Sequence, residues 1–180
     1  MIYIFLANGF EEIEALTPLD VFRRANLPTT TVSITENTTV IGSHNIPVIA
    51  DTTLPKVDLS DADLLLLPGG MPGTKYLGEC LPLCDAVTAH ANAGKPTAAI
   101  CAAPSVLGKL GLLCDKEAIC YPGFENALTG ATVSTKKVVR DGNIVTAAGM
   151  GVALEFALEC LILLGKGEDA ARIKTAVIAD

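Results

Sequence analysis

Short, fully apolar runs alternate along the chain with longer segments in which apolar residues recur at helical spacing. Apolar runs of strand length span residues 2–7, 63–68 and 97–100, and the β-branched run at 29–35 also predicts a strand. Strands without polar alternation are typical of parallel sheets that are covered by helices on both faces. The pattern therefore predicts an α/β fold with a doubly wound, mostly parallel sheet.

Helical periodicity fills the intervals between these strands. It predicts helices at 11–25, 76–93, 103–111, 151–165 and 168–175. Pro18 lies inside the first of these segments and follows a threonine that could cap a helix. Because proline cannot donate the backbone hydrogen bond of a helix interior, we expect a helix start or a kink there.

Turn signals add shorter elements to this plan. Residues 38–50 indicate two short strands around a turn, and residues 136–147 a hairpin with Asp141 and Gly142 at its turn. One more strand is expected at 117–122. No linker, repeat or low-complexity tract divides the chain, so residues 1–180 are expected to form a single domain.

Charge and hydropathy exclude several classes of partner. The formal net charge is −7, and no run of lysine and arginine interrupts the acidic composition. Such a surface repels phosphate backbones, which argues against binding to nucleic acid. The N-terminal segment has no basic leader, and the apolar stretch 152–164 contains two glutamates and is too short to span a bilayer. A cytoplasmic protein without a membrane partner is expected.

Six cysteines occur in the chain, and we expect all of them to be reduced because no export signal accompanies them. Cys80 and Cys84 are four residues apart on a predicted helix, which could place two metal ligands on one face. No CxxC motif or paired histidine completes such a site. Two small helix residues are the favoured interpretation, and neither a metal nor a cofactor is expected.

Cys101 lies in the stretch TAAICAAP, where a predicted strand ends and a helix begins. A side chain on such a turn projects over the sheet, as in nucleophile elbows, and small neighbours fit the crowded backbone. The amides that open the helix would lower the pKa of the thiol and could hold an oxyanion. A small buried core cysteine fits the same spacing equally well.

The paired glycines Gly69 and Gly70 end the neighbouring strand. Glycines at this position let the backbone approach a bound atom closely, so the Gly70 amide could be a second oxyanion donor. An ordinary turn would also place two glycines here. The stretch matches no nucleotide-binding fingerprint, so no phosphate site is assigned.

Histidine is scarce, which limits the choice of a base for Cys101. The chain has two histidines and none after Cys101. His90 lies mid-helix and is expected to be a packing or surface residue, whereas His44 lies on a loop and is a weak pocket candidate.

The remaining titratable groups come from the segment EEIE, which follows the first strand. We expect Glu11 and Glu12 to form a solvated first turn of a helix. Glu14 shares a helical stripe with Pro18 and Val21 and should face inward. A carboxyl group beside a thiolate should have a raised pKa and could donate a hydrogen bond to sulfur. Spacing alone does not choose among the three glutamates.

Five stretches together carry a resemblance to a known family: NGFEEIEALTPLDVFRRA, LLLLPGGMPG, AAICAAPSVL, CYPGFE and GVALEFAL. The chain resembles the ThiJ/PfpI family of the class I glutamine-amidotransferase-like superfamily, and within it the branch of the parkinsonism-associated protein deglycase and its bacterial homologues. The resemblance implies a flavodoxin-like three-layer sandwich and a homodimer.

The resemblance also implies a site. Cys101 would be the reactive cysteine and Glu14 its adjacent buried carboxyl group, with backbone donors at Gly70 and Ala102 beside Gly69. Many members carry a histidine about twenty residues after the cysteine, where this chain has Tyr121. That departure puts a cysteine–histidine relay in doubt, and Tyr121 could instead donate a hydrogen bond.

Two further positions follow from the resemblance. His44 stands where some members bring an arginine to the pocket, and Arg24 stands where relatives carry a basic residue on the dimer side of the pocket. Protease-like members have a histidine directly after the nucleophile. This chain has Ala102 there, which argues against peptidase activity.

The resemblance implies glutathione-independent glyoxalase activity on 2-oxoaldehydes, or deglycation of their protein adducts, as part of protection against oxidative stress. The alternative is a redox-sensing or chaperone-like protein that uses an oxidisable Cys101 without a dedicated substrate. A structural dimer without chemistry is a third interpretation.

Overall fold

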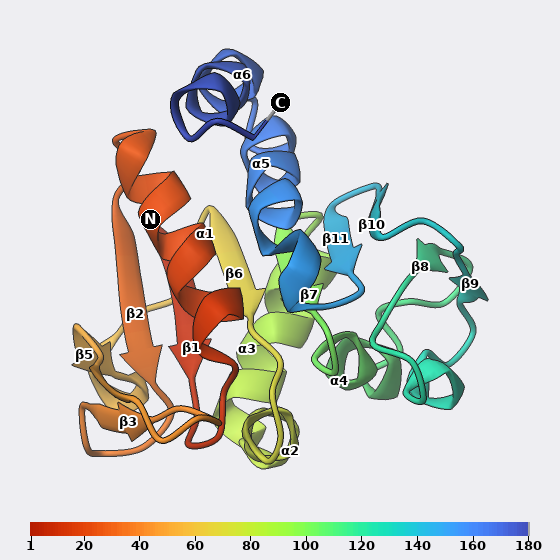
Figure 1. Ribbon diagram of the computed structural model, residues 1–180. Coiled ribbons are helices and arrows are strands. Elements are labelled where there is room, and N and C mark those ends of the chain that lie inside the picture. The colour runs from red at the N-terminus through yellow and green to blue at the C-terminus, as the bar shows by residue number, and fades with distance from the viewer. Residues whose placement is uncertain (180) are drawn as a thin grey trace.

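Seven strands form the central sheet in this computed structural model, which describes residues 1–179 (Figure 1). The strands are β1 (Ile2–Leu6), β2 (Thr29–Ser33), β5 (Thr52–Thr53), β6 (Leu64–Leu67), β7 (Thr97–Ile100), β10 (Val138–Asp141) and β11 (Ile144–Ala147). Their order is β10-β11-β7-β6-β1-β2-β5, and every pair is parallel except β10 with β11. The predicted hairpin at 136–147 is therefore confirmed.

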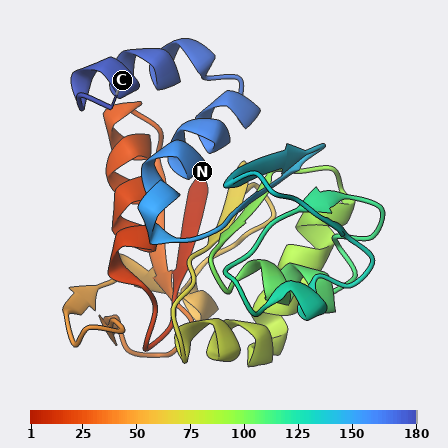
Figure 2. The ribbon, with the colours of Figure 1, turned by 45° about the vertical axis from the view of Figure 1, so that its right-hand side comes forward.

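Helices cover both faces of this sheet, which confirms the predicted three-layer α/β sandwich (Figures 1 and 2). One face carries α1 (Glu12–Arg24) and α5 (Ala153–Leu163), with α6 (Gly167–Ala176) packed on α5, and the other carries α2 (Gly73–Glu79), α3 (Leu81–Asn92) and α4 (Pro104–Lys109). Along β1, Ile4 packs into the core under α1 and α5, whereas Phe5 packs into the core on the opposite face. Strands that bury both faces explain the continuous apolar runs.

Smaller elements lie at the margins of the sheet. They are the antiparallel hairpin of β3 (Thr39–Ile41) and β4 (Pro47–Ile49), the parallel pair of β8 (Glu117–Ala118) and β9 (Thr132–Val133), and the short 3₁₀ helices η1 (Leu54–Lys56), η2 (Glu125–Ala127) and η3 (Met150–Val152). The hairpin confirms the two strands expected within 38–50. The strand expected at 117–122 ends at Ala118 and lies outside the main sheet.

Two predicted helices differ from the structure. The first helix begins at Glu12 and runs through Pro18 without a second start, and the Pro18 ring is buried against the core. The helix expected at 76–93 is instead two helices, which meet at Cys80. Pro82 explains the break because it has no N–H for the Gly78 carbonyl and its ring would clash with that group.

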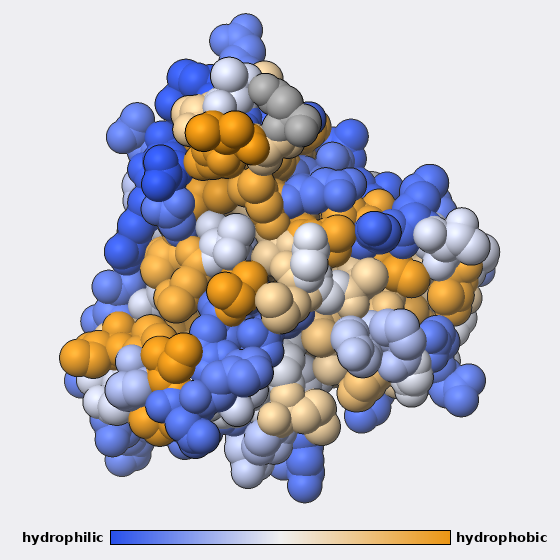
Figure 3. All heavy atoms as spheres, in the orientation of Figure 1, coloured by the Kyte–Doolittle hydropathy of each residue, from blue (hydrophilic) through white to orange (hydrophobic). Residues whose placement is uncertain are grey.

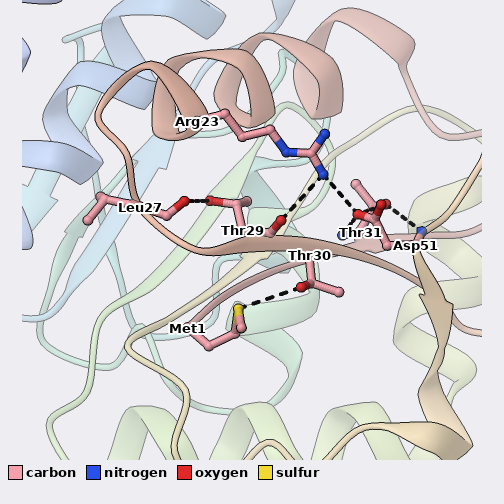
Figure 4. Close-up of polar contacts among 7 residues, drawn as sticks. All are labelled: Met1, Arg23, Leu27, Thr29, Thr30, Thr31 and Asp51. Carbon is pink, nitrogen blue, oxygen red and sulfur yellow. Dashed lines mark hydrogen bonds and ion pairs between the residues drawn. The ribbon is translucent and has the colours of Figure 1, made fainter.

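A polar network fixes the edge strand β5 (Figure 4). Asp51 Oδ2 accepts hydrogen bonds from the Thr31 backbone N–H (2.9 Å), the Thr31 hydroxyl (2.8 Å) and Arg23 Nη2 (3.0 Å). Arg23 Nη2 also contacts the Thr29 carbonyl at 3.4 Å. These contacts tie the C-terminal end of α1 to β2 and to the edge of the sheet.

The carboxyl ends of β1, β6 and β7 meet at one edge of the sheet, because these three strands are adjacent and parallel. The segments that follow them are 7–11, 68–72 and 101–103. Ligands of open α/β sheets bind at this edge. No helix in residues 1–179 is long and apolar enough to cross a bilayer.

Candidate functional site

Cys101 forms the turn between β7 and α4 and has a φ angle of 65°, in the left-handed region that side chains rarely adopt. Its N–H donates to the Ala147 carbonyl at 2.8 Å, and its carbonyl accepts from the Tyr121 N–H at 2.7 Å. Neighbouring segments thus hold the unusual backbone on both sides. The thiol on this turn is only half-buried, so of the two interpretations that the spacing left open the structure favours the elbow over a fully buried core cysteine.

Glu14 faces this thiol from the first turn of α1. Its side chain is buried with Pro18 and Val21, as the helical stripe predicted. Oε2 accepts the Gly69 N–H at 3.0 Å, and the carboxyl group lies beside the Cys101 thiol, with which it interacts. The Met150 backbone also lies close enough to the carboxyl group to lower its pKa. The structure therefore selects Glu14 among the three glutamates as the one in contact with Cys101.

Two glycines allow this close approach. A Cβ on Gly69 would lie 2.6 Å from the Cβ of Cys101 and 2.7 Å from Glu14 Oε2. Gly70 has a φ angle of 88°, and a Cβ there would overlap the backbone at Gly9 and Glu11. An ordinary turn would not require glycine at both positions. Gly69 is needed because Cys101 and Glu14 pack directly against it, and Gly70 because its backbone is left-handed and packs against the backbone of residues 9–11.

Burial, together with the charge of a neighbouring carboxylate, raises the pKa of both members of this pair. Burial is the main reason that the pKa of Glu14 rises to about 7. Burial, followed by the charge of Glu14 and its hydrogen bond, raises the pKa of the Cys101 thiol to about 12. Backbone hydrogen bonds from Gly70 and Ala102 lower this pKa but do not offset the increase.

The raised Glu14 pKa confirms the sequence-based expectation, whereas the expectation of a lowered Cys101 pKa is wrong. The six-residue helix α4 and the two amides are outweighed by burial beside a carboxylate. Burial, the charge of Glu14 and its hydrogen bond raise the thiol pKa, and the last two of these act only when Glu14 is a carboxylate. Protonation of Glu14 removes both effects, so the Cys101 thiolate forms most easily when Glu14 is protonated.

The other two glutamates do not form the solvated turn that was expected. Glu12 is buried, and its carboxylate accepts the His44 backbone N–H at 2.9 Å and lies 2.8 Å from His44 Nδ1. Ser43 Oγ donates to Glu11 Oε2 at 3.1 Å and to Glu12 Oε2 at 3.2 Å. The Glu12–His44 contact holds the β3–β4 turn over the start of α1.

Glu11, Glu12 and His44 form the one group in residues 1–179 whose spacing would suit a metal ion, with ligand atoms within 4.8 Å of one another. Ser43 Oγ lies 3.0 Å from His44 Nδ1 and bonds both carboxylates. The four side chains thus satisfy one another by hydrogen bonds. Their arrangement is explained as a structural contact of the hairpin.

The remaining candidates are dispersed. Tyr121 is half exposed and reaches Cys101 through its backbone N–H. Arg24 pairs with Asp20 at 2.6 Å, ten residues after Glu14 and about 15 Å farther along α1. Within one chain, Arg24 is therefore remote from Cys101. His90 is buried, with Nε2 2.9 Å from the Pro96 carbonyl, as expected for a packing residue.

Met150 is the contact that the sequence did not reveal. Its backbone reaches Glu14 because the segment after β11 crosses the carboxyl edge of the sheet. No side-chain chemistry marks such a residue, since the contact uses only the main chain. The nearest signal in the sequence is the pair of glycines on either side of it.

A profile of the DJ-1/PfpI family matches residues 1–163, which include the elbow and both of its partners. The chain belongs to the DJ-1/PfpI family. Protein DJ-1 homolog B of Arabidopsis thaliana is 40% identical over 92% of this chain, which spans 38% of that longer relative. Protein dj-1beta of Drosophila melanogaster is 37% identical over 87% of this chain and 84% of its own length.

Solved structures confirm the fold of this DJ-1/PfpI member. An oxidized DJ-1 from Toxoplasma gondii superposes with a TM-score of 0.94 at 32% identity, covering 98% of this chain and 97% of the other. The expected family and the flavodoxin-like sandwich are thereby established.

Proposed function

We propose that this chain is a cysteine-dependent enzyme that converts small 2-oxoaldehydes, or their early protein adducts, to 2-hydroxy acids without glutathione or a cofactor. The observation that carries the proposal is the contact between the Cys101 thiol and Glu14, a carboxyl group whose pKa lies near neutrality. A group that titrates near the working pH is suited to both donate and accept a proton.

The first step is addition of the Cys101 sulfur to the aldehyde carbon. A new C–S bond forms, the aldehyde oxygen takes a proton, and the product is a hemithioacetal next to the ketone. The backbone N–H groups of Gly70 and Ala102, which point at the sulfur, would stabilise the negative oxygen during addition.

The second step moves hydrogen between the two carbons. Glu14, as a carboxylate, removes the proton from the sulfur-bearing carbon, which gives an enediol, and then returns a proton to the neighbouring carbon. The former aldehyde carbon is now a thioester and the former ketone an alcohol. Water hydrolyses the thioester, releasing the 2-hydroxy acid and the free thiol. One carbon is oxidised and the other reduced, so no external oxidant is required.

The test is lactate formation from methylglyoxal by the purified protein. We expect Cys101→Ser to abolish turnover, because its hydroxyl is a far weaker nucleophile at neutral pH. Cys114→Ser is the matched control, because Cys114 is also a free cysteine but is exposed and outside the site. Equal turnover by wild type and Cys101→Ser would refute the proposal.

A second function, redox sensing, is supported by the same surroundings. The amides of Gly70 and Ala102 and the Glu14 carboxyl group could hold the oxygens of a sulfinate at Cys101, formed as peroxide oxidises the thiol twice and is reduced to water. This function would need no dedicated substrate. Mass spectrometry after mild peroxide treatment tests it, and oxidation of other cysteines before Cys101 would rule it out.

We also propose that the chain forms a homodimer in the cytoplasm. Exposed apolar side chains occur on α1 (Ile13 and Leu16) and at the β3–β4 hairpin (Ile46 and Ile49), and orange patches mark these regions in Figure 3. Burying them between two copies would be favourable. Light scattering should report a dimer for wild type and a monomer for Ile13→Glu, whereas a monomeric wild type would contradict the proposal. Cell fractionation tests the location.

A further inference from the structure

An open pocket of about 350 Å³ lies among the segments that pack against the elbow, although neither Cys101 nor Glu14 lines it. Its walls come from two segments, 121–122 and 148–152, and Lys137 completes its lining. The volume is within the range of small-molecule sites, which is roughly 300–1,000 Å³.

Both walls of this pocket are attached to the proposed reacting pair. The Tyr121 N–H donates to the Cys101 carbonyl at 2.7 Å, and the Met150 backbone lies close enough to the Glu14 carboxyl group to lower its pKa. A molecule whose aldehyde reaches Cys101 would therefore extend its other end between these two walls.

Lys137 is the one charged residue that lines the pocket. Its backbone carbonyl accepts the Ala148 N–H at 2.9 Å, which places the residue at the side of the pocket. Among residues 1–179 its ammonium group has no acidic partner within ion-pair distance, whereas Lys136 pairs with Glu117 at 3.2 Å and Arg140 with Glu159 at 3.0 Å. In a chain of net charge −7, the positive group at this site is free to bind an anion.

We propose that Lys137 binds the carboxylate of the substrate, so that the preferred substrates are 2-oxoaldehydes with a carboxylate at the end opposite the aldehyde. The inference rests on the proposed function, because it assumes that the aldehyde reacts at Cys101. Tyr121 and Met150 would contact the apolar middle of such a molecule, which leaves the ammonium of Lys137 to bind its charged end.

The experiment compares 4,5-dioxopentanoate with its neutral methyl ester, which has the same reacting groups. We expect wild type to prefer the acid in kcat/KM by about fivefold, the size of one partly exposed ion pair. The preference should fall as salt is added, because the pair is screened. Lys137→Met should remove it and Lys137→Glu should invert it. Lys136→Met is the matched control and should retain it.

Two results would overturn the inference about Lys137: equal kcat/KM for the acid and the ester in wild type, or an unchanged preference in Lys137→Met. Turnover of methylglyoxal would still support the proposed function in either case. Absence of turnover with every aldehyde would reject the proposed function instead. The role of Lys137 is then decided by alkylation of Cys101 with iodoacetamide. 4-Oxopentanoate should protect wild type better than its methyl ester does, and equal protection by the two would overturn the inference.

Discussion

Glu12 and Glu14 lie two positions apart in the first turn of the same helix, and both are buried, yet their pKa values move in opposite directions. The pKa of Glu12 is lowered to about 2, whereas that of Glu14 is raised to about 7. The difference comes from the deeper burial of Glu14 and from the hydrogen bonds that Glu12 accepts from a neighbouring segment.

Burial raises the pKa of Glu12, but hydrogen bonds from the His44 ring, from its own backbone, from the His44 backbone and from Ser43 outweigh that effect. Burial dominates at Glu14, where the hydrogen bonds from the Cys101 thiol and the Gly69 and Met150 backbones are too weak to offset it. Glu12 therefore stays charged at neutral pH, and its charge stabilises the contact with the β3–β4 turn. Glu14 can gain or lose a proton near neutral pH. The charge of each carboxyl group thus depends both on how deeply it is buried and on the hydrogen bonds it accepts.

The largest expected effect separates the two glutamates in catalysis. Glu14→Gln removes the group that we propose transfers the proton, so kcat for methylglyoxal should fall about a thousandfold. Glu12→Gln should change kcat by less than about tenfold, since it acts through the hairpin and touches no reacting atom. Steady-state lactate formation measures both variants, and a similar loss in each would erase the proposed distinction.

The second prediction concerns stability and the sign of its pH dependence at Glu14. Because its folded pKa is raised to about 7 from 4.5, the folded state binds the extra proton between these values. This contribution to stability is fully present below pH 4.5 and is lost as the pH rises through 7. Relative to Glu14→Gln, the free energy of unfolding of wild type should increase from pH 8 to pH 5 by on the order of 3 kcal/mol. Urea titrations at both values test this, and a gain in the opposite direction would contradict it.

Glu12 should show the opposite sign. Its lowered pKa stabilises the fold above pH 4.5, and this stabilisation is lost as the pH falls toward 2. At pH 7, Glu12→Gln should cost about 2 kcal/mol of unfolding free energy, because charged hydrogen bonds are lost in a buried place. The cost should shrink in acid, and a cost that is constant from pH 7 to pH 3 would show that the carboxylate charge is not what stabilises the hairpin.

The smallest effect is expected for His44→Ala, which leaves Ser43 and the backbone N–H as donors to Glu12. The His44 side chain is largely exposed, so the melting temperature should fall less than in Glu12→Gln. Activity should not change. Calorimetry tests the ranking of the two variants, and a larger loss in His44→Ala would reverse it.

The sequence could reveal the layers and the place of the site because both depend on local patterns. Apolar strands indicated the parallel sheet, and the residues after three of them, including Cys101 and Gly69, proved to be neighbours. The helical stripe that turned Glu14 inward is equally local.

Tertiary contacts explain what the sequence could not reveal. Glu12 is buried because the β3–β4 turn, some thirty residues away, covers it. The pKa of Cys101 is raised first by burial and then by Glu14, which approaches it from another strand–helix junction. Met150 contributes only its backbone. Pro82 marks the break between α2 and α3 in the sequence, but apolar residues at helical spacing on both sides of it favoured one continuous helix.

The hydrogen bond between the Tyr121 N–H and the Cys101 carbonyl has a consequence for how this fold can diversify. Support for the elbow comes from the main chain, so the side chain at position 121 is free to change while the turn keeps its shape. A tyrosine can therefore stand at this position without altering the turn. Proline alone is excluded, because it has no N–H to donate. Substitution at position 121 can therefore change the side chain that lines the pocket while the backbone that presents Cys101 stays the same.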